Sequence, residues 1–242
     1  MIEINKLYLL DAFELLKQIT DGSIDLVLTD PPYNIEWKEN IELHGRKAFY
    51  HSYEELREWD KLDKSFYFNL FKEFNRILKE TGSVIIFCRN ELITWILEAG
   101  KDNDLDYKAT IFINKTNPMP QVRKVNYLSS IESIAWLARK RKKIPYTFNF
   151  KTQNEMHNLI RIPICSGKER TNHPTQKSLR LIRFLLEVHS NKGDIVVDCF
   201  AGSGTTLVSC KQLGRNFIGC DNNEKYFKMA LKRLEQNVIS DY

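Results

Sequence analysis

Four consecutive residues, Asp30, Pro31, Pro32 and Tyr33, have the types needed to hold a flat polar ring. Each proline fixes its own φ angle and lacks a backbone N–H, and the residue before a proline is steered toward extended backbone. We therefore expect a stiff turn that presents one carboxylate, free carbonyl oxygens and one aromatic ring. Taken alone, the same four residues would also suit a structural corner with a surface tyrosine.

The chemistry that suits this turn is group transfer to the exocyclic amine of a nucleobase. Such an amine is a poor nucleophile because its lone pair is delocalised into the ring. The Asp30 carboxylate and the Pro31 carbonyl could accept its two N–H bonds and favour a pyramidal nitrogen, without a covalent intermediate. Tyr33 offers a face for stacking the base. Because a paired base is out of reach, the chemistry implies a base flipped out of its duplex.

A second loop, residues 200–206, reads Phe-Ala-Gly-Ser-Gly-Thr-Thr. Gly202 and Gly204 allow a ligand to approach the backbone, and the helix expected to follow offers N–H groups to an anion. Leu207 stands where a dinucleotide fingerprint has its third glycine, so a pyrophosphate fits poorly. Asp221, at the end of the next expected strand, is placed like a ribose-binding carboxylate. A nucleoside carrying an amino-acid carboxylate, such as S-adenosylmethionine, suits this loop; a glycine turn that serves packing alone is the alternative.

Alternating strands and helices must position these two loops. The expected strands span residues 5–10, 24–29, 83–87, 107–113, 131–137, 194–199 and 216–220, and the expected helices span 11–18, 65–79, 91–99, 178–189, 205–213 and 223–236. This alternation predicts an α/β fold with a parallel sheet covered by helices, in which ligands bind at the carboxyl ends of strands. Asp11, after the first strand, could cap a helix or contact a ligand.

Two regions interrupt the alternation. Residues 34–60 carry many charged and aromatic side chains without a period, which favours a lid or substrate-binding loop over a solvated insertion. Residues 114–170 hold 12 Lys and Arg against 3 Asp and Glu, whereas the rest of the chain holds 24 against 28. A basic insertion with aromatic residues is typical of a nucleic-acid surface, although a run of cations alone could be a solvated face. The DNA contacts that we expect are Arg123, Lys124, Arg139, Lys140, Arg141, Lys142 and Lys143.

The composition fits one large α/β domain with an insertion, or two small domains, in a chain of 242 residues that is 43% hydrophobic. The five cysteines are scattered without ligand spacing, so we expect buried thiols in a reducing compartment and no metal site. No run approaches the ~18 apolar residues of a membrane span, and the start lacks the layout of a signal peptide. We therefore expect a cytoplasmic protein with no membrane partner.

Together these motifs resemble the beta group of amino-directed DNA methyltransferases, in which a DPPY motif precedes a target-recognition region and an FxGxG cofactor loop. The match covers nearly the whole chain and includes the segments at 114–118 and 173–177. It is nearest to the small adenine-N6 enzymes of bacterial restriction–modification systems. The resemblance implies a Rossmann-like, doubly wound, mostly parallel sheet with permuted motif order. The catalytic and cofactor-binding domain would span 1–113 and 171–242, and the target-recognition insertion 114–170.

The resemblance also implies roles for single residues. Asp30 and the Pro31 carbonyl would hold the target amine, Pro32 would shape the turn, and Tyr33 would stack on the base. Around S-adenosylmethionine it places Asp11 and Ala12 at the adenine, Asp221 at the ribose, Phe200, Gly202, Ser203 and Gly204 at the methionine, and His173, Thr175 and Lys177 at the carboxylate, with Thr205 and Asp30 also in contact. One departure is Cys199, which stands where the family often has proline.

An aspartate at position 30, where similar N4-cytosine enzymes usually carry serine, favours adenine N6 as the target. N4-cytosine methylation is the alternative because both amines need the same two acceptors, and a catalytically silent DNA-binding relative is a third hypothesis. No Pro-Cys dipeptide occurs, so carbon-5 cytosine methylation would lack its nucleophile. The expected partner is DNA; the resemblance is also compatible with a homodimer and with a restriction endonuclease of the same system, without direct contact between them.

Overall fold

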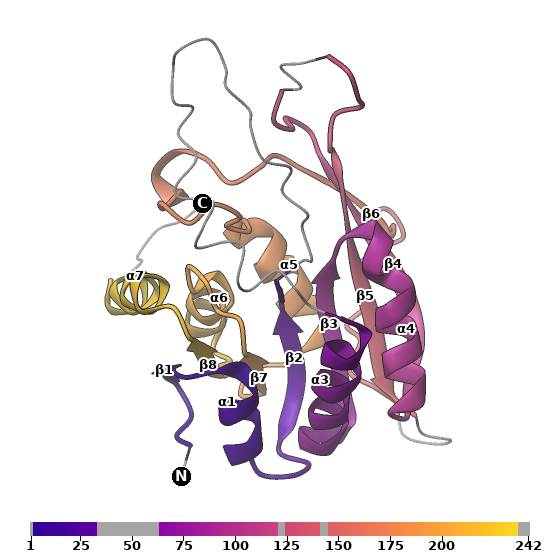
Figure 1. The fold of residues 1–242 in the computed structure, drawn as a ribbon, viewed down its shortest axis with the longest axis vertical. Helices are drawn as coiled ribbons and strands as arrows, with labels where there is room; N and C mark the ends of the chain where they lie inside the picture. The colour runs from indigo at the N-terminus through magenta and orange to yellow at the C-terminus, as the bar shows by residue number, and fades with distance from the viewer. Residues whose placement is uncertain (1, 33–62, 121–123, 141–144, 237–242) are drawn as a thin grey trace.

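Strands and helices alternate along the chain in the computed structural model, which describes residues 2–32, 63–120, 124–140 and 145–236 (Figure 1). Tyr33, Arg123, Arg141, Lys142, Lys143 and the loop over 34–60 lie outside these residues. The strands are β1 (Lys6–Leu9), β2 (Ile24–Thr29), β3 (Leu78–Cys88), β4 (Leu105–Lys115), β5 (Ile131–Arg139), β6 (Leu159–Ile162), β7 (Ile195–Asp198) and β8 (Asn216–Asp221). The helices are α1 (Ala12–Gln18), α3 (Lys64–Ile77), α4 (Ile93–Asp102), α5 (Leu179–His189), α6 (Thr205–Leu213) and α7 (Glu224–Glu235), with short 3₁₀ turns at Asn90–Leu92 and Gly167–Glu169.

The strands form one eight-stranded sheet in the order β1-β8-β7-β2-β3-β5-β4-β6. Neighbouring strands pair in parallel except at β5, which is antiparallel to both β3 and β4. From β2 the chain crosses to β3 on one side, and from β7 it crosses to β8 on the other. The carboxyl ends of β2 and β7 therefore form the topological switch point, where ligands bind in open α/β sheets. The predicted doubly wound, mostly parallel sheet is confirmed.

Helices cover both faces of the sheet (Figure 1). The apolar sides of α1, α3 and α4 pack on one face, in a buried cluster that includes Leu15, Phe74 and Ile96. The opposite face is covered by α5, α6 and α7, through a second cluster that includes Leu185 and Leu207. Strands buried on both faces read as continuous apolar runs, which is why the sequence predicted them well.

The second predicted helix, expected over 65–79, ends two residues early, and the strand after it begins five residues early. The prediction of helix to residue 79 is wrong because Leu78 already has extended backbone and starts β3. Both carboxylate oxygens of Asp25 on β2 accept from the Lys79 ammonium at 2.8 Å, which holds this segment along β2. The register between β2 and β3 then shifts, so that residues 79–82 form an irregular stretch before the main ladder.

The basic region over 114–170 contributes two strands to the sheet. Strand β5 lies between β3 and β4, and its residues from Ser133 to Ala138 are buried. Strand β6 was not predicted, because four residues at the edge of a sheet are too short to show a period. The described part of this region is thus partly built into the α/β domain.

Two further expectations concern cysteines and membranes. The five cysteines are buried and free, which confirms the prediction of buried thiols. Among the residues that the structure describes, no helix has both the length and the apolar character needed to cross a membrane.

Candidate active site

The two loops singled out in the sequence come together at the switch point. Because β2 and β7 are adjacent and parallel, Asp30 at the end of β2 lies beside the loop that follows β7. The Thr29 hydroxyl donates a hydrogen bond of 2.8 Å to the buried Asp198 carboxylate, which links the last residue of one strand to the last of the other. Burial raises the pKa of Asp198 to about 6. The structure therefore joins both loops in one site.

The turn after β2 is held from two sides. Pro31 is buried, and the hydroxyl of Tyr67 on α3 lies 3.5 Å from the Pro32 carbonyl, to which it donates. The Asp30 carboxylate lies 2.8 Å from the Lys177 ammonium, which also lies 4.9 Å from the centre of the Phe87 ring. The family resemblance implied that Lys177 contacts the carboxylate of the cofactor. In the structure its ammonium forms an ion pair with Asp30.

Lys177 belongs to a chain of charges that sequence reasoning missed. Its ammonium lies 3.5 Å from Glu132 at the start of β5, and Glu132 lies 2.6 Å from the Lys115 ammonium at the end of β4. Burial opposes the charge on Lys177, but Asp30 and Glu132 raise its pKa to about 12. Lys177 therefore stays charged at neutral pH.

The glycine loop needs both of its glycines. Gly202 and Gly204 have φ angles of +51° and +76°, which residues with a Cβ rarely adopt. A Cβ would lie 2.8 Å from His173 Nε2 at Gly202 and 2.7 Å from the Ala230 Cβ at Gly204. The Gly202 N–H donates to the Asp221 carboxylate at 2.8 Å, so the predicted ribose ligand also fixes the loop.

Arg233 on α7 also holds the glycine loop, and the sequence did not predict this residue as part of the site. Its guanidinium donates to the Ser203 carbonyl at 2.6 Å, to the Ser203 hydroxyl at 3.2 Å and to the Thr205 hydroxyl at 3.0 Å. In the sequence, Arg233 is one of several cations on an amphipathic helix, so no local signal distinguishes it. Its three bonds fix the backbone just before α6.

Three aromatic rings, Phe13, Phe66 and Phe200, form an aromatic wall next to the glycine loop. The Phe66 ring lies 5.6 Å from Phe13 and 6.2 Å from Phe200, measured between centroids. Phe200 was predicted, whereas Phe13 and Phe66 were not, because aromatic residues at helical spacing usually serve the core. Asp11 caps α1 by accepting from the Phe13 N–H at 2.8 Å, and Ala12 is buried. Asp11 thus caps the helix at the edge where the ligand contact was expected.

His173 and Thr175 lie on the segment that leads to α5. The His173 ring packs against Tyr226 at 4.4 Å, and its Nδ1 is buried without a hydrogen-bond partner among the described residues. Burial, and then the nearby Lys177, lower the pKa of His173 to about 4, so the ring is neutral at pH 7. Thr175 is exposed. His173 therefore places Nε2 beside Gly202 and keeps its second ring nitrogen, Nδ1, unsatisfied.

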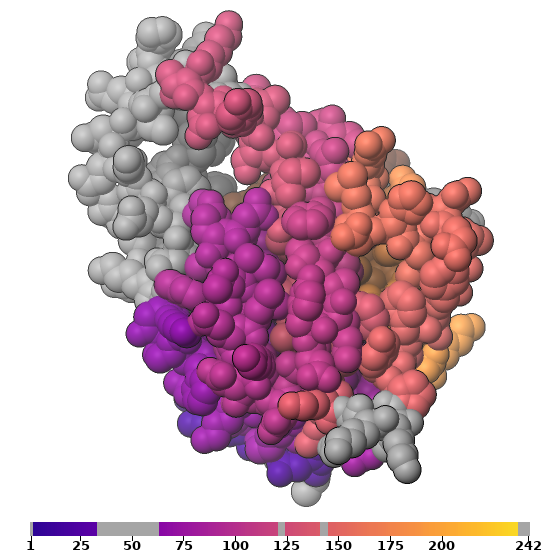
Figure 2. Space-filling view, turned by 90° about the vertical axis from the view of Figure 1, so that its right-hand side faces the viewer, coloured from indigo at the N-terminus to yellow at the C-terminus, as the bar shows by residue number. Residues whose placement is uncertain are grey.

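The predicted DNA contacts are divided between the two ends of the strands. Lys124 lies on the connection from β4 to β5. The described part of this connection lies beyond the carboxyl end of β2, the strand that leads to Asp30 (Figure 1), and it projects from the body of the molecule (Figure 2). The same connection exposes Tyr127 to 93%. Because β5 runs antiparallel to β3, Arg139 and Lys140 lie at the opposite end of the strands, where Arg139 donates to the Leu78 carbonyl at 2.6 Å. The structure does not bring these two cations together with Asp30.

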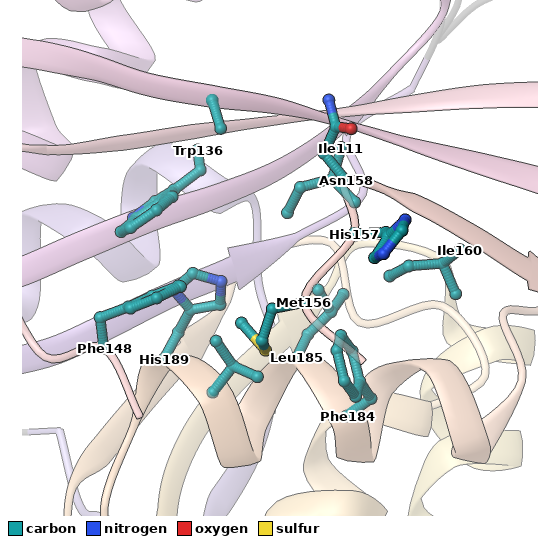
Figure 3. Close-up of a pocket in the computed structure, with 12 residues that line it drawn as sticks. Ile111, Trp136, Phe148, Met156, His157, Asn158, Ile160, Phe184, Leu185 and His189 are labelled. Atoms are coloured by element: carbon teal, nitrogen blue, oxygen red, sulfur yellow. The ribbon is translucent and has the colours of Figure 1, made fainter. Parts of the chain in front are cut away.

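A cavity of about 90 Å³ lies away from this site, between the sheet and α5 (Figure 3). Trp136 stacks on Phe148 at 4.9 Å, and the His189 ring lies 4.7 Å from Trp136. The lining residues are Ala109, Ile111, Trp136, Phe148, Met156, His157, Asn158, Ile160, Phe184, Leu185, Val188 and His189, and no predicted site residue is among them.

The residues at the switch point fit S-adenosylmethionine. The backbone of Gly202 and Gly204 provides a cradle that a Cβ would fill, and Asp221 stands at its edge. His173 adds a buried nitrogen whose hydrogen-bonding capacity is unmet. The aromatic wall offers an apolar surface that suits a purine.

Comparison with known proteins gives the same picture. A family model described as DNA methylase matches residues 24–232. The chain is 32% identical over 244 residues to the type II methyltransferase M.HinfI of Haemophilus influenzae, covering 93% of this chain and 67% of the relative. It is 30% identical over 249 residues to the type II methyltransferase M2.DpnII of Streptococcus pneumoniae, covering 96% of this chain and 90% of the relative.

Solved structures resemble this one closely. The complex of M1.HpyAVI with S-adenosylmethionine superposes with a TM-score of 0.71 at 33% identity, covering 95% of this chain and 98% of the other. The cytosine-N4-specific PvuII DNA methyltransferase gives a TM-score of 0.74 at 20% identity, covering 97% and 88%. This second likeness is one of fold alone.

Proposed function

Because the chain belongs to the DNA methylase family and is an S-adenosylmethionine-dependent DNA methyltransferase, we propose that it methylates the N6 amine of an adenine flipped out of DNA. The observation that carries the proposal is the placement of Asp30, whose carboxylate stands at the switch point beside the glycine loop. Aspartate heads this motif, where N4-cytosine enzymes of similar sequence usually carry serine.

The residues around Asp30 prepare it to hold an amine. The carboxylate accepts one N–H of the adenine amine and the Pro31 carbonyl accepts the other, which aims the nitrogen lone pair along one direction. Tyr67 and the buried Pro31 keep the turn in place. S-adenosylmethionine, when bound, supplies the electrophilic methyl group, and the cradle of Gly202 and Gly204 holds it beside Asp30.

DNA approaches from the edge that carries Asp30. The connection between β4 and β5 provides Lys124 for a phosphate and the exposed Tyr127 for stacking on a base. The basic region over 114–170 contributes target recognition from this connection, while its strands support the sheet. The duplex thus covers the carboxyl ends of the parallel strands, and one flipped base enters the turn at Asp30.

An Asp30→Ala variant tests this assignment. We expect methyl transfer to DNA to fall by roughly 100- to 1,000-fold, because removing a preorganised electrostatic group costs ~3–4 kcal/mol of barrier. The affinity for DNA should change less than about threefold. Asp25→Ala is the matched control: Asp25 lies at the other end of the same strand and pairs with Lys79. Retained turnover in Asp30→Ala would refute the role of Asp30.

A further inference from the structure

Four charged side chains of alternating sign run from the candidate active site to strands β5 and β4. The Asp30 carboxylate lies 2.8 Å from the Lys177 ammonium, which lies 3.5 Å from Glu132, which lies 2.6 Å from Lys115. The Lys177 side chain is 10% exposed and the Glu132 side chain 23%. Such a chain is balanced in charge, and its buried members need one another.

The topology explains why Glu132 reaches Asp30. Strand β5 runs antiparallel to β3, so its first residues lie at the edge where the parallel strands end. Glu132 pairs with Ile113 across the ladder, and Lys115 follows on β4. A parallel strand at this place would have brought its other end to the site. The reversed strand thus delivers a carboxylate to a lysine that precedes α5.

Lys177 and the target amine compete for one acceptor. A lysine ammonium has three N–H donors, and a carboxylate has about four lone-pair directions. If Asp30 were the sole anion near Lys177, the ammonium would bind it more tightly and oppose the approach of the amine. A second carboxylate divides the attraction and draws the ammonium toward β5.

We propose that Glu132 is a positioning residue for methyl transfer, which shares the Lys177 ammonium with Asp30 and so weakens its hold on the carboxylate that receives the target amine. This inference rests on the proposed function. Burial opposes the charge on Glu132, but Lys177 and Lys115 lower its pKa, so the carboxylate is ionised at neutral pH. Glu132 acts through Lys177 and touches neither the base nor the cofactor.

The test is the Glu132→Gln variant, which keeps the shape of the side chain and removes its charge. We expect the single-turnover rate of methyl transfer at saturating DNA and S-adenosylmethionine to fall roughly 10- to 100-fold. The dissociation constants for S-adenosylmethionine and DNA should stay within about threefold of wild type. Glu187→Gln is the matched control: Glu187 pairs with Lys151 at 2.5 Å on the outer side of α5. It should leave the rate unchanged.

A second background separates positioning from simple support of the fold. Glu132→Gln should have little effect on the rate in a Lys177→Gln background, since Glu132 acts through that lysine, and Glu132→Asp should recover part of the wild-type rate. The inference would be overturned if Glu132→Gln lowered the rate equally with and without Lys177, or if it lowered the melting temperature and left the rate at 25 °C unchanged. An inactive wild-type protein would instead overturn the proposed function, and an active wild type with an equally active Glu132→Gln would overturn the inference alone.

Discussion

The two glycines that flank α6 offer a controlled test of the cofactor cradle. Gly204 at its start and Gly214 at its end have similar φ angles, +76° and +70°, but their surroundings differ. A Cβ at Gly204 would lie 2.7 Å from the Ala230 Cβ, whereas a Cβ at Gly214 would meet nothing within 4 Å. Substitution by alanine therefore imposes the same backbone strain at both places and a steric clash at Gly204 alone.

The expected magnitudes follow from this difference. Left-handed backbone costs a residue with a Cβ ~1–2 kcal/mol, so Gly214→Ala should lower the free energy of unfolding by that amount. Overpacking adds ~1–3 kcal/mol, so Gly204→Ala should lose about 2–5 kcal/mol. The clash with Ala230 must push the glycine loop away from α7 and so distort the cofactor cradle. The affinity of Gly204→Ala for S-adenosylmethionine should therefore fall more than about tenfold. Gly214→Ala should bind it as wild type does.

Urea unfolding and calorimetric titration with S-adenosylmethionine measure both quantities. Adding Ala230→Gly to Gly204→Ala removes the clashing methyl group, and it should restore most of the cofactor affinity, although glycine within α7 costs ~1 kcal/mol of stability. The reasoning is refuted if Gly204→Ala and Gly214→Ala lose equal stability and both bind the cofactor normally.

Two further substitutions probe groups outside the turn. Burial lowers the pKa of His189 to about 3, so on acidification below ~6.5 the unfolded chain binds a proton there that the folded chain does not. Stability is thus lost as the pH falls from ~6.5 toward 3. His189→Phe should reduce this loss by up to ~1.4 kcal/mol per pH unit, measured by urea unfolding at pH 7, 6 and 5. An unchanged dependence of stability on pH in the variant would contradict this role of His189. Arg233→Met should cost ~1–3 kcal/mol of stability and weaken S-adenosylmethionine binding, because the Ser203 carbonyl loses its donor. The exposed neighbour Lys232→Met should do neither; equal effects would refute the role of Arg233.

The features that the sequence predicted well are local ones. Two prolines after an apolar run predict a turn at a strand end, and glycines before a helix predict a cradle, whatever the rest of the chain does. The structure places both at the switch point between β2 and β7. The alternation of buried runs and amphipathic helices likewise needs no distant contact to be recognised.

The features that the sequence did not reveal depend on pairings between distant segments. Glu132 reaches Lys177 because β5 is reversed, and nothing near Glu132 in the chain indicates that reversal. Arg233 reaches Ser203 through the packing of α7 on the loop. The same reversal carries Arg139 and Lys140 to the opposite ends of the strands, so these two predicted DNA contacts lie apart from Asp30. Side-chain partners across a sheet require its strand order, which periodicity does not provide.

The most direct test of the central claim identifies the methylated base. The wild-type protein is incubated with unmethylated DNA and S-adenosylmethionine labelled in its methyl group, and the DNA is digested to nucleosides and separated. We predict label in N6-methyldeoxyadenosine, incorporated at least about 100-fold more slowly in the Asp30→Ala reaction. Label in N4-methyldeoxycytidine would contradict the assignment of the target base, and an absence of label in any nucleoside would contradict the catalytic role of the turn.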